Sequence, residues 1–284
     1  MQIFRSINKL QKSIIGLKKK GKTIGFVPTM GYLHDGHLSL MRQSKKENDI
    51  SVISIFVNPI QFGPREDFKK YPRDFSRDEK LAKSVGVDII FYPSKKQMYP
   101  DGYLTYVEVE KLSNLLCAAS RPDHFRGVTT VVTKLFNIVQ PDIAYFGQKD
   151  AQQARIIQKM TQDLNMPMKI KVMPIVRESD GLAMSSRNVY LSTHQRKDAL
   201  ILNRALKEAR RLIKAWARDS RIIISSLNYL ISAKHTAKID YVEIVDPDSL
   251  TELKKVQKKA LIVLAVWIGK THLIDNAVIK ICRN

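Results

Sequence analysis

Short apolar runs alternate with longer stretches of helical periodicity in the chain up to residue 176. Runs of apolar and β-branched residues predict buried strands, and they occupy positions 23–27, 51–57, 88–92, 142–146 and 169–176. Between these runs the apolar positions recur with helical spacing, at 36–48, 74–85, 129–139 and 151–164. Such alternation is typical of a parallel sheet covered by helices on both faces, so we expect an α/β fold.

The pattern changes near residue 177, where a polar, turn-rich stretch interrupts the alternation. Two helical segments follow at 193–217 and 221–232, and then strand-like runs at 239–245, 260–268 and 271–281. Helices followed by a group of strands predict a smaller α+β domain. The sequence therefore predicts two domains, residues 1–177 and residues 178–284.

Polar and glycine-rich loops follow four of the predicted strands. They are PTMGYLHDGH after 23–27, NPIQFG after 51–57, GQKDAQQ after 142–146 and RESDGLAMSSRN after 169–176. In an open parallel sheet, ligands bind outside the carboxyl ends of the strands, which lie at one edge. We therefore expect these four loops to meet and to form one site.

His34 and His37 lie one helical turn apart at the start of a predicted helix, in the pattern H-x-G-H. If Asp35 and Gly36 open this helix, both imidazoles share a side with the free N–H groups of its first turn. That arrangement favours a phosphate, because the N–H groups and the helix dipole are positive there. The alternative is two half-exposed histidines that begin an ordinary helix. A zinc site is disfavoured, because no suitable third ligand lies nearby in the sequence.

Two further polar groups suit a nucleotide. The run MSSRN at 184–188 supplies hydroxyls and a guanidinium, whose planar donors match phosphate oxygens. Lys149 supplies a cation, and Asp150 a carboxylate for magnesium or ribose. Turn residues and a helix start are the ordinary alternatives for these two groups. Asp78 and Glu79 lie on a predicted helix, where a solvent-exposed face explains them more simply than a magnesium site.

Composition limits the classes of protein to which the chain can belong. Its 284 residues include 48 Lys and Arg against 27 Asp and Glu, a formal net charge of +21. Such an excess attracts polyanions, but the basic pairs are scattered, which indicates a general surface bias rather than a nucleic-acid site. We find no membrane span and no secretion signal in the sequence. Cys117 and Cys282 have no metal-ligand spacing, so we expect free thiols and a cytoplasmic location.

Several longer motifs together resemble one enzyme family. They are PTMGYLHDGHLSLM, FVNPIQF, YPR, SRPDHFRGVTTVVTKLFNIVQPDIAYFGQKDAQQ, DGLAMSSRN and GKTHLIDN, in this order and over nearly the whole chain. H-x-G-H alone would indicate only the nucleotidyltransferase superfamily, but this combination resembles the pantothenate synthetases, or pantoate–β-alanine ligases. The resemblance implies a Rossmann-like parallel-sheet domain, a smaller α+β C-terminal lid domain and a homodimer.

The resemblance also implies a reaction. (R)-Pantoate would attack the α-phosphorus of ATP to give pantoyl adenylate and pyrophosphate, and β-alanine would then release AMP and form pantothenate. Mg²⁺ would accompany ATP. The substrate itself becomes a mixed anhydride, so the protein needs no covalent nucleophile. Its tasks are alignment and charge stabilisation.

The matched motifs imply which residues bind ATP. His34 and His37 would hold the triphosphate, with His37 as the proton-donor candidate, while Lys149 and Arg187 would close over the phosphates from the other side. The expected ATP-binding residues are Met30, Gly31, Tyr32, Leu33, His34, Asp35, Gly36, His37, Gly147, Gln148, Lys149, Asp150, Val176, Met184, Ser185, Ser186 and Arg187.

Other matched residues would bind pantoate and the metal ion. Gln61 and Gln153 would bond to the hydroxyls and carboxylate of pantoate, because neutral amides bind polar groups without fixing a charge. Arg121 is a weaker candidate for the substrate, and Asp78 matches a carboxylate associated with magnesium. The family often has Glu where this chain has Gln148, so a role for a carboxylate there does not carry over.

Two other functions fit parts of this pattern. Another H-x-G-H nucleotidyltransferase would share the histidines but would lack Gln61 and Gln153 as paired amides. A basic RNA-binding protein related to a tRNA synthetase would show a clustered basic face and an additional RNA-binding part. The sequence contains both amides, and it shows neither a clustered basic face nor an additional RNA-binding part. It therefore favours a ligase that acts on small molecules.

Overall fold

The computed structural model describes residues 1–64, 66–119 and 121–281. The chain divides into two units. The first contains residues 1–114, 118–148 and 153–174, and the second contains residues 115–117, 149–152 and 175 onward. The division near residue 175 lies close to the expected boundary at 177, but two short internal segments also belong to the second unit. Cys117 forms no disulfide among the described residues, and Cys282 lies outside them.

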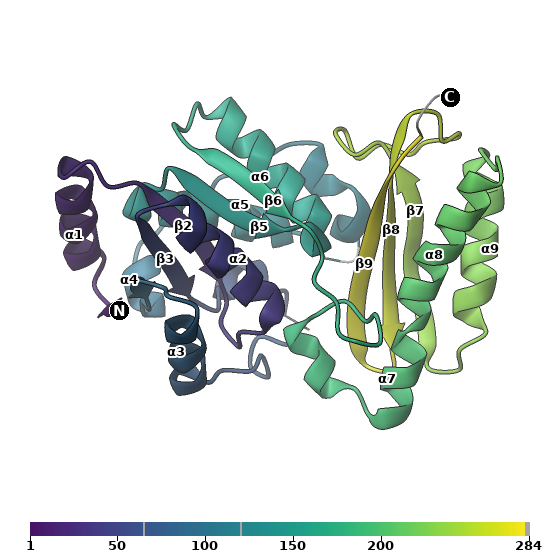
Figure 1. Ribbon diagram of the computed structural model, residues 1–284, viewed down its shortest axis with the longest axis horizontal. Helices are drawn as coiled ribbons and strands as arrows, with labels where there is room; N and C mark the ends of the chain where they lie inside the picture. The colour runs from purple at the N-terminus through teal and green to yellow at the C-terminus, as the bar shows by residue number, and fades with distance from the viewer. Residues whose placement is uncertain (65, 120, 282–284) are drawn as a thin grey trace. The chain divides into compact units, whose positions relative to one another are not determined.

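Six parallel strands form the sheet of the first unit, in the spatial order β1-β4-β3-β2-β5-β6; Figure 1 labels β3, β2, β5 and β6. Their bounds are β1 (Gln2–Phe4), β2 (Ile24–Thr29), β3 (Ile50–Ile55), β4 (Ile89–Phe91), β5 (Ile143–Gly147) and β6 (Lys169–Met173). β2 and β5 are neighbours in space although β3 and β4 separate them in sequence. The chain order reverses between them, which makes this the topological switch point where ligands bind in such sheets.

Helices cover both faces of this sheet. They are α1 (Ile7–Lys19), α2 (Asp35–Glu47), α3 (Phe75–Ser84), α4 (Lys95–Met98), α5 (His124–Val139) and α6 (Ala151–Asp163), with short 3₁₀ helices η1 (Pro59–Gln61), η2 (Leu112–Asn114), η3 (Leu116–Ala119) and η4 (Gln148–Asp150). The side chains of successive residues of β2 point to opposite faces of the sheet. Phe26 meets Phe136 of α5 edge-on, whereas Val27 packs in a core cluster with Leu38 and Met41 of α2. Burial on both faces explains why the central strand β2 is largely apolar.

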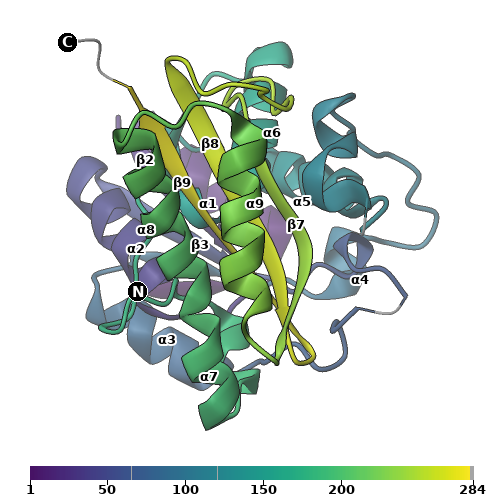
Figure 2. The ribbon, with the colours of Figure 1, turned by 90° about the vertical axis from the view of Figure 1, so that its right-hand side faces the viewer.

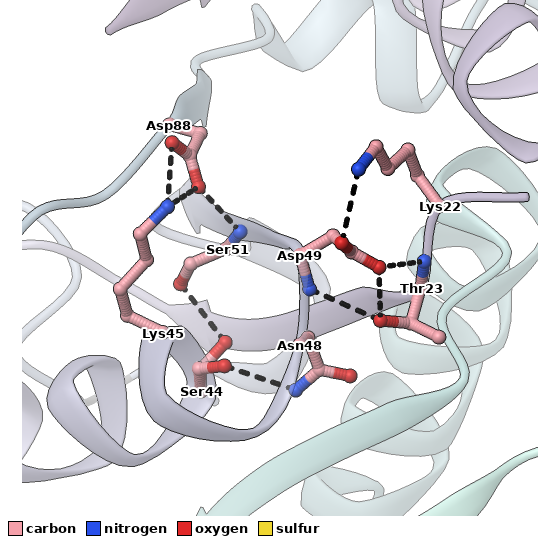
Figure 3. Close-up of polar contacts among 8 residues, drawn as sticks. All are labelled: Lys22, Thr23, Ser44, Lys45, Asn48, Asp49, Ser51 and Asp88. Carbon is pink, nitrogen blue, oxygen red and sulfur yellow. Dashed lines mark hydrogen bonds and ion pairs between the residues drawn. The ribbon is translucent and has the colours of Figure 1, made fainter. Parts of the chain in front are cut away.

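A polar network fixes the C-terminal half of α2 to the sheet (Figure 3). Ser51 Oγ on β3 donates to Ser44 Oγ at 2.9 Å, and Asn48 Nδ2 donates to the Ser44 carbonyl at 2.9 Å. Asp88 accepts from the Ser51 backbone N–H at 2.8 Å and from Lys45 Nζ at 2.9 Å. Because Ser44 and Ser51 are fully buried, these bonds satisfy polar groups that would otherwise be costly. They fix the end of α2 opposite the histidines.

The second unit is a three-stranded antiparallel sheet with helices on one face. The strands β7 (Ala237–Val245), β8 (Lys259–Ile268) and β9 (Thr271–Lys280) lie in that order. The helical segments are η5 (Ser186–Tyr190), α7 (Thr193–Ala199), α8 (Ile201–Lys214) and α9 (Ser220–Ser232). Figure 2 shows α8 and α9 side by side against the three strands, and their apolar residues share one core cluster with β8 and β9. The expected α/β fold with a smaller α+β part is confirmed.

Several predicted boundaries were wrong. Residues 2–4 form the edge strand β1, too short to give a periodic signal, and the helix expected over 193–217 is interrupted at Leu200 between α7 and α8. α5 begins at His124 rather than 129, with Gly127 in its first turn. This glycine is required because a Cβ there would lie 2.4 Å from the Ile60 carbonyl oxygen. Among the described residues, no helix is long and apolar enough to cross a membrane.

Candidate active site

The chain turns sharply between β2 and α2. Gly31 and Tyr32 both have left-handed backbone conformations, with φ of 83° and 52°. Thr29 Oγ1 accepts a hydrogen bond from the Gly31 N–H at 3.1 Å and donates to the Ser54 carbonyl on β3 at 2.7 Å. A non-glycine residue rarely adopts a positive φ, so the turn through Tyr32 requires support from its surroundings.

Asp78 on α3 supplies that support. Its two carboxylate oxygens accept hydrogen bonds from the N–H groups of Tyr32 and Leu33, both at 2.7 Å. The side chain is 2% exposed, and a Cβ on Gly31 would lie 2.9 Å from Asp78 Oδ2. Burial raises the pKa of Asp78, while the two N–H groups and the Arg77 guanidinium act to lower it. The solvent-exposed interpretation of Asp78 was therefore wrong.

The two histidines meet at the N-terminus of α2. His34 is the residue before the helix and His37 is its third residue; their ring centroids are 4.0 Å apart. The His34 backbone N–H donates to His37 Nδ1 at 3.4 Å. A neutral His37 therefore carries its proton on Nε2, where it can donate to an anion. The N–H groups of Asp35 and Gly36, in the same turn, have no acceptor within the helix.

This turn lies at the switch point of the sheet. The histidines follow β2, while Gly147 ends β5, the neighbouring strand, and Gln148 follows it. Residues 58–63 follow β3, the other neighbour of β2. Three of the four predicted loops therefore begin at one edge of the first unit. The fourth run, residues 177–188, belongs to the second unit together with Lys149 and Asp150.

Gln61 contacts the start of the histidine loop. It ends η1, is 8% exposed, and its Nε2 donates to Met30 Sδ at 3.1 Å. Gln153, its expected partner at pantoate, is half-buried near the start of α6. The structure thus places one of the two predicted amides beside the loop that carries the H-x-G-H histidines.

The Arg121 guanidinium binds protein groups. Its Nε donates to Glu66 Oε1 at 3.0 Å, a second nitrogen contacts Glu66 Oε2, and Nη1 lies 3.1 Å from His124 Nε2. Burial raises the pKa of Glu66, but the hydrogen bond and charge of Arg121 outweigh it and the net shift is downward. The ion pair shows that this arginine has a structural partner, which the sequence did not indicate.

In the second unit, residues 176–188 form a compact polar turn. Arg177 pairs with Ala183 in an antiparallel bridge, and the Met184 N–H donates to the Val176 carbonyl at 3.0 Å. Ser185 then begins η5, where its Oγ accepts from the Arg187 N–H at 3.2 Å. Three predicted ATP-binding positions, Val176, Met184 and Ser185, therefore lie close together.

A buried ion pair joins this turn to β9. Arg177 donates to both carboxylate oxygens of Asp275, at 2.7 and 2.9 Å, and Asp275 is 2% exposed. The next residue, Asn276, donates to the Lys149 carbonyl at 2.9 Å. A hollow in this unit is lined by Lys149, Leu182, Ala183, Ser185, Leu202, Leu273, Ile274 and Asp275. Lys149 and Ser185, which were expected to bind phosphate, thus line the same hollow.

Sequence reasoning did not single out Arg177 or Asp275. The available signal was an acidic residue in the middle of the predicted strand 271–281, because a buried carboxylate requires a cationic or hydrogen-bonding partner. Asp78 was chosen for a metal ion, whereas the structure uses both of its oxygens for backbone N–H groups. Within residues 1–64, 66–119 and 121–281 we find no group of three or more His, Cys, Asp or Glu arranged to hold a metal ion.

Comparison with known proteins identifies the family. A profile described as pantoate-beta-alanine ligase matches residues 2–278. Similar relatives include the pantothenate synthetase of Acetivibrio thermocellus, 55% identical over 281 residues, which cover 99% of this chain and 100% of the relative. The pantothenate synthetase of Sulfurihydrogenibium sp. is 56% identical over 277 residues, which cover 97% of this chain and 99% of the relative.

Solved structures agree with this result. Pantothenate synthetase from Thermus thermophilus superposes with a TM-score of 0.93 at 42% identity, covering 98% of this chain and 99% of that one. A pantoate-beta-alanine ligase from Francisella tularensis was solved with beta-gamma ATP and beta-alanine. It gives a TM-score of 0.78 at 35% identity, and the match covers 98% of this chain and 97% of that one. The chain is thus an enzyme that belongs to the pantoate–β-alanine ligase family.

Proposed function

We propose that this ligase joins (R)-pantoate to β-alanine in two steps, with pantoyl adenylate as the intermediate. A pantoate carboxylate oxygen attacks the α-phosphorus of ATP, and the bond to the β-phosphate breaks to release pyrophosphate. The β-alanine amine then attacks the acyl carbon, loses a proton and displaces AMP. Both steps require aligned reactants and stabilised charge, which the protein supplies without a covalent nucleophile.

The observation that carries this proposal is the position of His34 and His37 at the N-terminus of α2, beside the switch point of the sheet. Oriented N–H groups and the helix dipole stabilise a triphosphate there. The pattern of hydrogen bonds leaves a proton on His37 Nε2, so this atom donates to a phosphate oxygen as negative charge develops. His34, whose ring is tilted by 34° against that of His37 with the centroids 4.0 Å apart, holds the same phosphates.

Residues of the second unit bind the same nucleotide in this proposal. Lys149 and Ser185 are among the residues that line one small hollow, and ammonium and hydroxyl groups can both donate to phosphate oxygens. Arg187 adds a planar set of donors next to Ser185. The remaining expected contacts to ATP come from Gly147, Gln148, Asp150, Val176, Met184 and Ser186.

Pantoate binds at the amides of Gln61 and Gln153 in this scheme. The contact between Gln61 Nε2 and Met30 Sδ supports this role for Gln61. Met30 belongs to the loop that carries the histidines, so a substrate bound to Gln61 would lie close to that loop. An amide can donate to a carboxylate or hydroxyl oxygen of pantoate without introducing a charge. Arg121 is the weaker substrate candidate, because its guanidinium is paired with Glu66.

Magnesium fits this site as a companion of ATP. When bound, Mg²⁺ would neutralise charge on the phosphates. It is usually held by phosphate oxygens, water and one or two carboxylates, which agrees with the lack of a three-residue metal cluster among the described residues. Each Asp78 oxygen accepts one hydrogen bond from an N–H group, so each can offer a metal ion only its remaining lone pair. Asp150, half-exposed beside Lys149, is a second candidate carboxylate.

We also propose a homodimer, which the family resemblance implies, and a cytoplasmic location, which the two cysteines without metal-ligand spacing indicate. Analytical ultracentrifugation of the purified protein tests the first, and a mass of one chain at micromolar concentration would contradict it. Cell fractionation tests the second.

Incubating the purified protein with ATP, Mg²⁺, pantoate and β-alanine tests the function. We expect pantothenate and AMP in equal amounts. Without β-alanine, we expect one equivalent of pyrophosphate per enzyme, formed only when pantoate is present. Pyrophosphate release that does not need pantoate would contradict the proposal, and steeply salt-dependent RNA binding would support the nucleic-acid alternative.

A further inference from the structure

The amide of Gln61 is held by a second buried amide, that of Asn58. Asn58 is 1% exposed, and its Nδ2 donates to Gln61 Oε1 at 3.1 Å and to the Gly127 carbonyl at 3.0 Å. Its Oδ1 accepts from the Tyr99 hydroxyl at 2.8 Å. An amide nitrogen has two hydrogens, and here each hydrogen has its own acceptor. The Asn58 side chain is therefore held on three sides.

These partners determine which way the Gln61 amide faces. A backbone carbonyl can only accept, so the Asn58 nitrogen must face Gly127 and its oxygen must face the Tyr99 hydroxyl. The second Asn58 hydrogen then points at Gln61, which must present Oε1 to it. Gln61 Nε2 is consequently directed away from Asn58, to the Met30 side.

The backbone of Gln61 is fixed by the motif RPDHFRG. His124 Nδ1 lies 2.7 Å from the Gln61 carbonyl oxygen, so this ring nitrogen carries the proton and donates. His124 Nε2 then accepts from Arg121 Nη1 at 3.1 Å. Gly127 allows α5 to approach closely, because a Cβ there would lie 2.6 Å from Gln61 Cα. Both the main chain and the side chain of Gln61 are thus positioned by residues 121–127.

We propose that Tyr99 is a positioning residue for pantoate. Its hydroxyl and the Gly127 carbonyl bind opposite ends of the Asn58 amide, and Asn58 in turn makes Gln61 present an N–H donor to the substrate. The carboxylate and hydroxyl oxygens of pantoate can accept a hydrogen bond from this N–H donor. The inference rests on the proposed role of Gln61 in binding pantoate.

Replacing Tyr99 by Phe tests this inference, with Tyr103→Phe as the matched control. The Tyr103 ring packs edge-on against Tyr99, with centroids 5.0 Å apart, but it lies outside the bonds that lead to Asn58. We expect Tyr99→Phe to raise the KM for pantoate about fivefold to tenfold, the usual effect of one hydrogen bond, while the KM for ATP changes less than twofold. Tyr103→Phe should leave both constants unchanged.

A double-mutant cycle with Gln61→Ala separates positioning from general packing. If Tyr99 acts through Gln61, then Tyr99→Phe has no further effect on pantoate once Gln61 is Ala. The inference is overturned if Tyr99→Phe behaves like Tyr103→Phe, raises both KM values equally, or keeps its full effect beside Gln61→Ala. A wild-type protein without pantoate-dependent pyrophosphate release would instead refute the proposed function itself.

Discussion

Asp78 accepts a 2.7 Å hydrogen bond from the backbone N–H of Leu33, 45 residues earlier in the chain. The same carboxylate binds the Tyr32 N–H, so helix α3 sets the conformation of the turn that leads into α2. The histidines begin one residue after Leu33. Their positions therefore depend on a carboxylate that lies outside the H-x-G-H motif.

Asp78→Ala should destabilise the protein by about 2–4 kcal/mol, because the buried Leu33 N–H and the half-buried Tyr32 N–H lose their acceptor. Activity should fall as well, since the turn before His34 loses its support. Urea unfolding measures the stability. Glu79→Ala, which removes the neighbouring carboxylate on the same helix, is the control and should change the urea midpoint little. If the Asp78→Ala protein is as stable as this control, the two hydrogen bonds to Asp78 do not contribute to the stability of the fold.

Gly31→Ala should be more harmful than Gly21→Ala. Both glycines have a positive φ, of 83° and 72°, so each substitution incurs the left-handed penalty of roughly 1–2 kcal/mol. At Gly21 the added Cβ meets nothing within 4 Å, whereas at Gly31 it meets Asp78 Oδ2 and Ile55 Cγ2 at 2.9 Å. The difference in melting temperature between the two variants measures the cost of the steric clash at Gly31. Equal melting temperatures would show that the added Cβ meets no significant clash there.

His37→Ala should slow pantoyl adenylate formation roughly 100- to 1,000-fold, because the developing phosphate charge loses a donor. The fold should survive, since His37 is half-buried at a helix start. Single-turnover pyrophosphate release measures this step, and circular dichroism checks the fold. The exposed His235→Ala is the control. Unchanged adenylation in His37→Ala would remove this histidine from the mechanism.

Arg177→Met should destabilise the second unit by about 3–5 kcal/mol, because Asp275 is left as an uncompensated buried charge. Arg211→Met is the matched control, since Arg211 pairs with Glu208 on the surface and such pairs contribute little. Hydrogen exchange of amides in β9 reports on the second unit directly. Similar protection of β9 in both variants would show that the buried pair does not support this strand.

Asp49→Asn should alter the acid stability of the protein. Hydrogen bonds from the backbone and hydroxyl of Thr23, and then Lys22, lower the pKa of Asp49 from 3.8 to about 2 (Figure 3). A carboxyl whose pKa is lowered by folding stabilises the fold above its unfolded pKa and loses that contribution as the pH falls. Wild-type protein should therefore exceed Asp49→Asn in urea midpoint above pH 4.

The difference in urea midpoint should shrink between pH 4 and pH 2, where Asp49 takes up its proton in the folded state. Asp101→Asn is the control, because the Asp101 side chain is 99% exposed. A wild-type advantage that stays constant down to pH 2 would contradict the assigned cause of the pKa shift.

The parallel sheet could be predicted because its signals are local. Strands such as 51–57 and 142–146 are mostly apolar runs without a regular polar alternation, which is typical of buried parallel strands. The edge strand at 2–4 and the first turn of α5 gave no such signal. Gly127 looks like a helix breaker in the sequence, and only the closeness of Ile60 explains why a helix contains it there.

The candidate site was predictable in its residue types but not in its supporting contacts. His34 and His37 could be placed together because helical spacing brings positions three apart onto one side. Asp78 could not be assigned its role, because the N–H groups that it binds are 45 and 46 residues away in sequence. The pairing of Arg121 with Glu66 was hidden for the same reason, since it joins residues 55 apart.

The chain passes between its two units after Asn114, Cys117, Gln148, Gln152 and Pro174. A cut at residue 174 would therefore not separate two self-sufficient modules. A fragment beginning at Ile175 would lack Lys149, whose carbonyl accepts from Asn276 on β9. Exchanging the C-terminal part between relatives would consequently also require exchanging the two short internal segments.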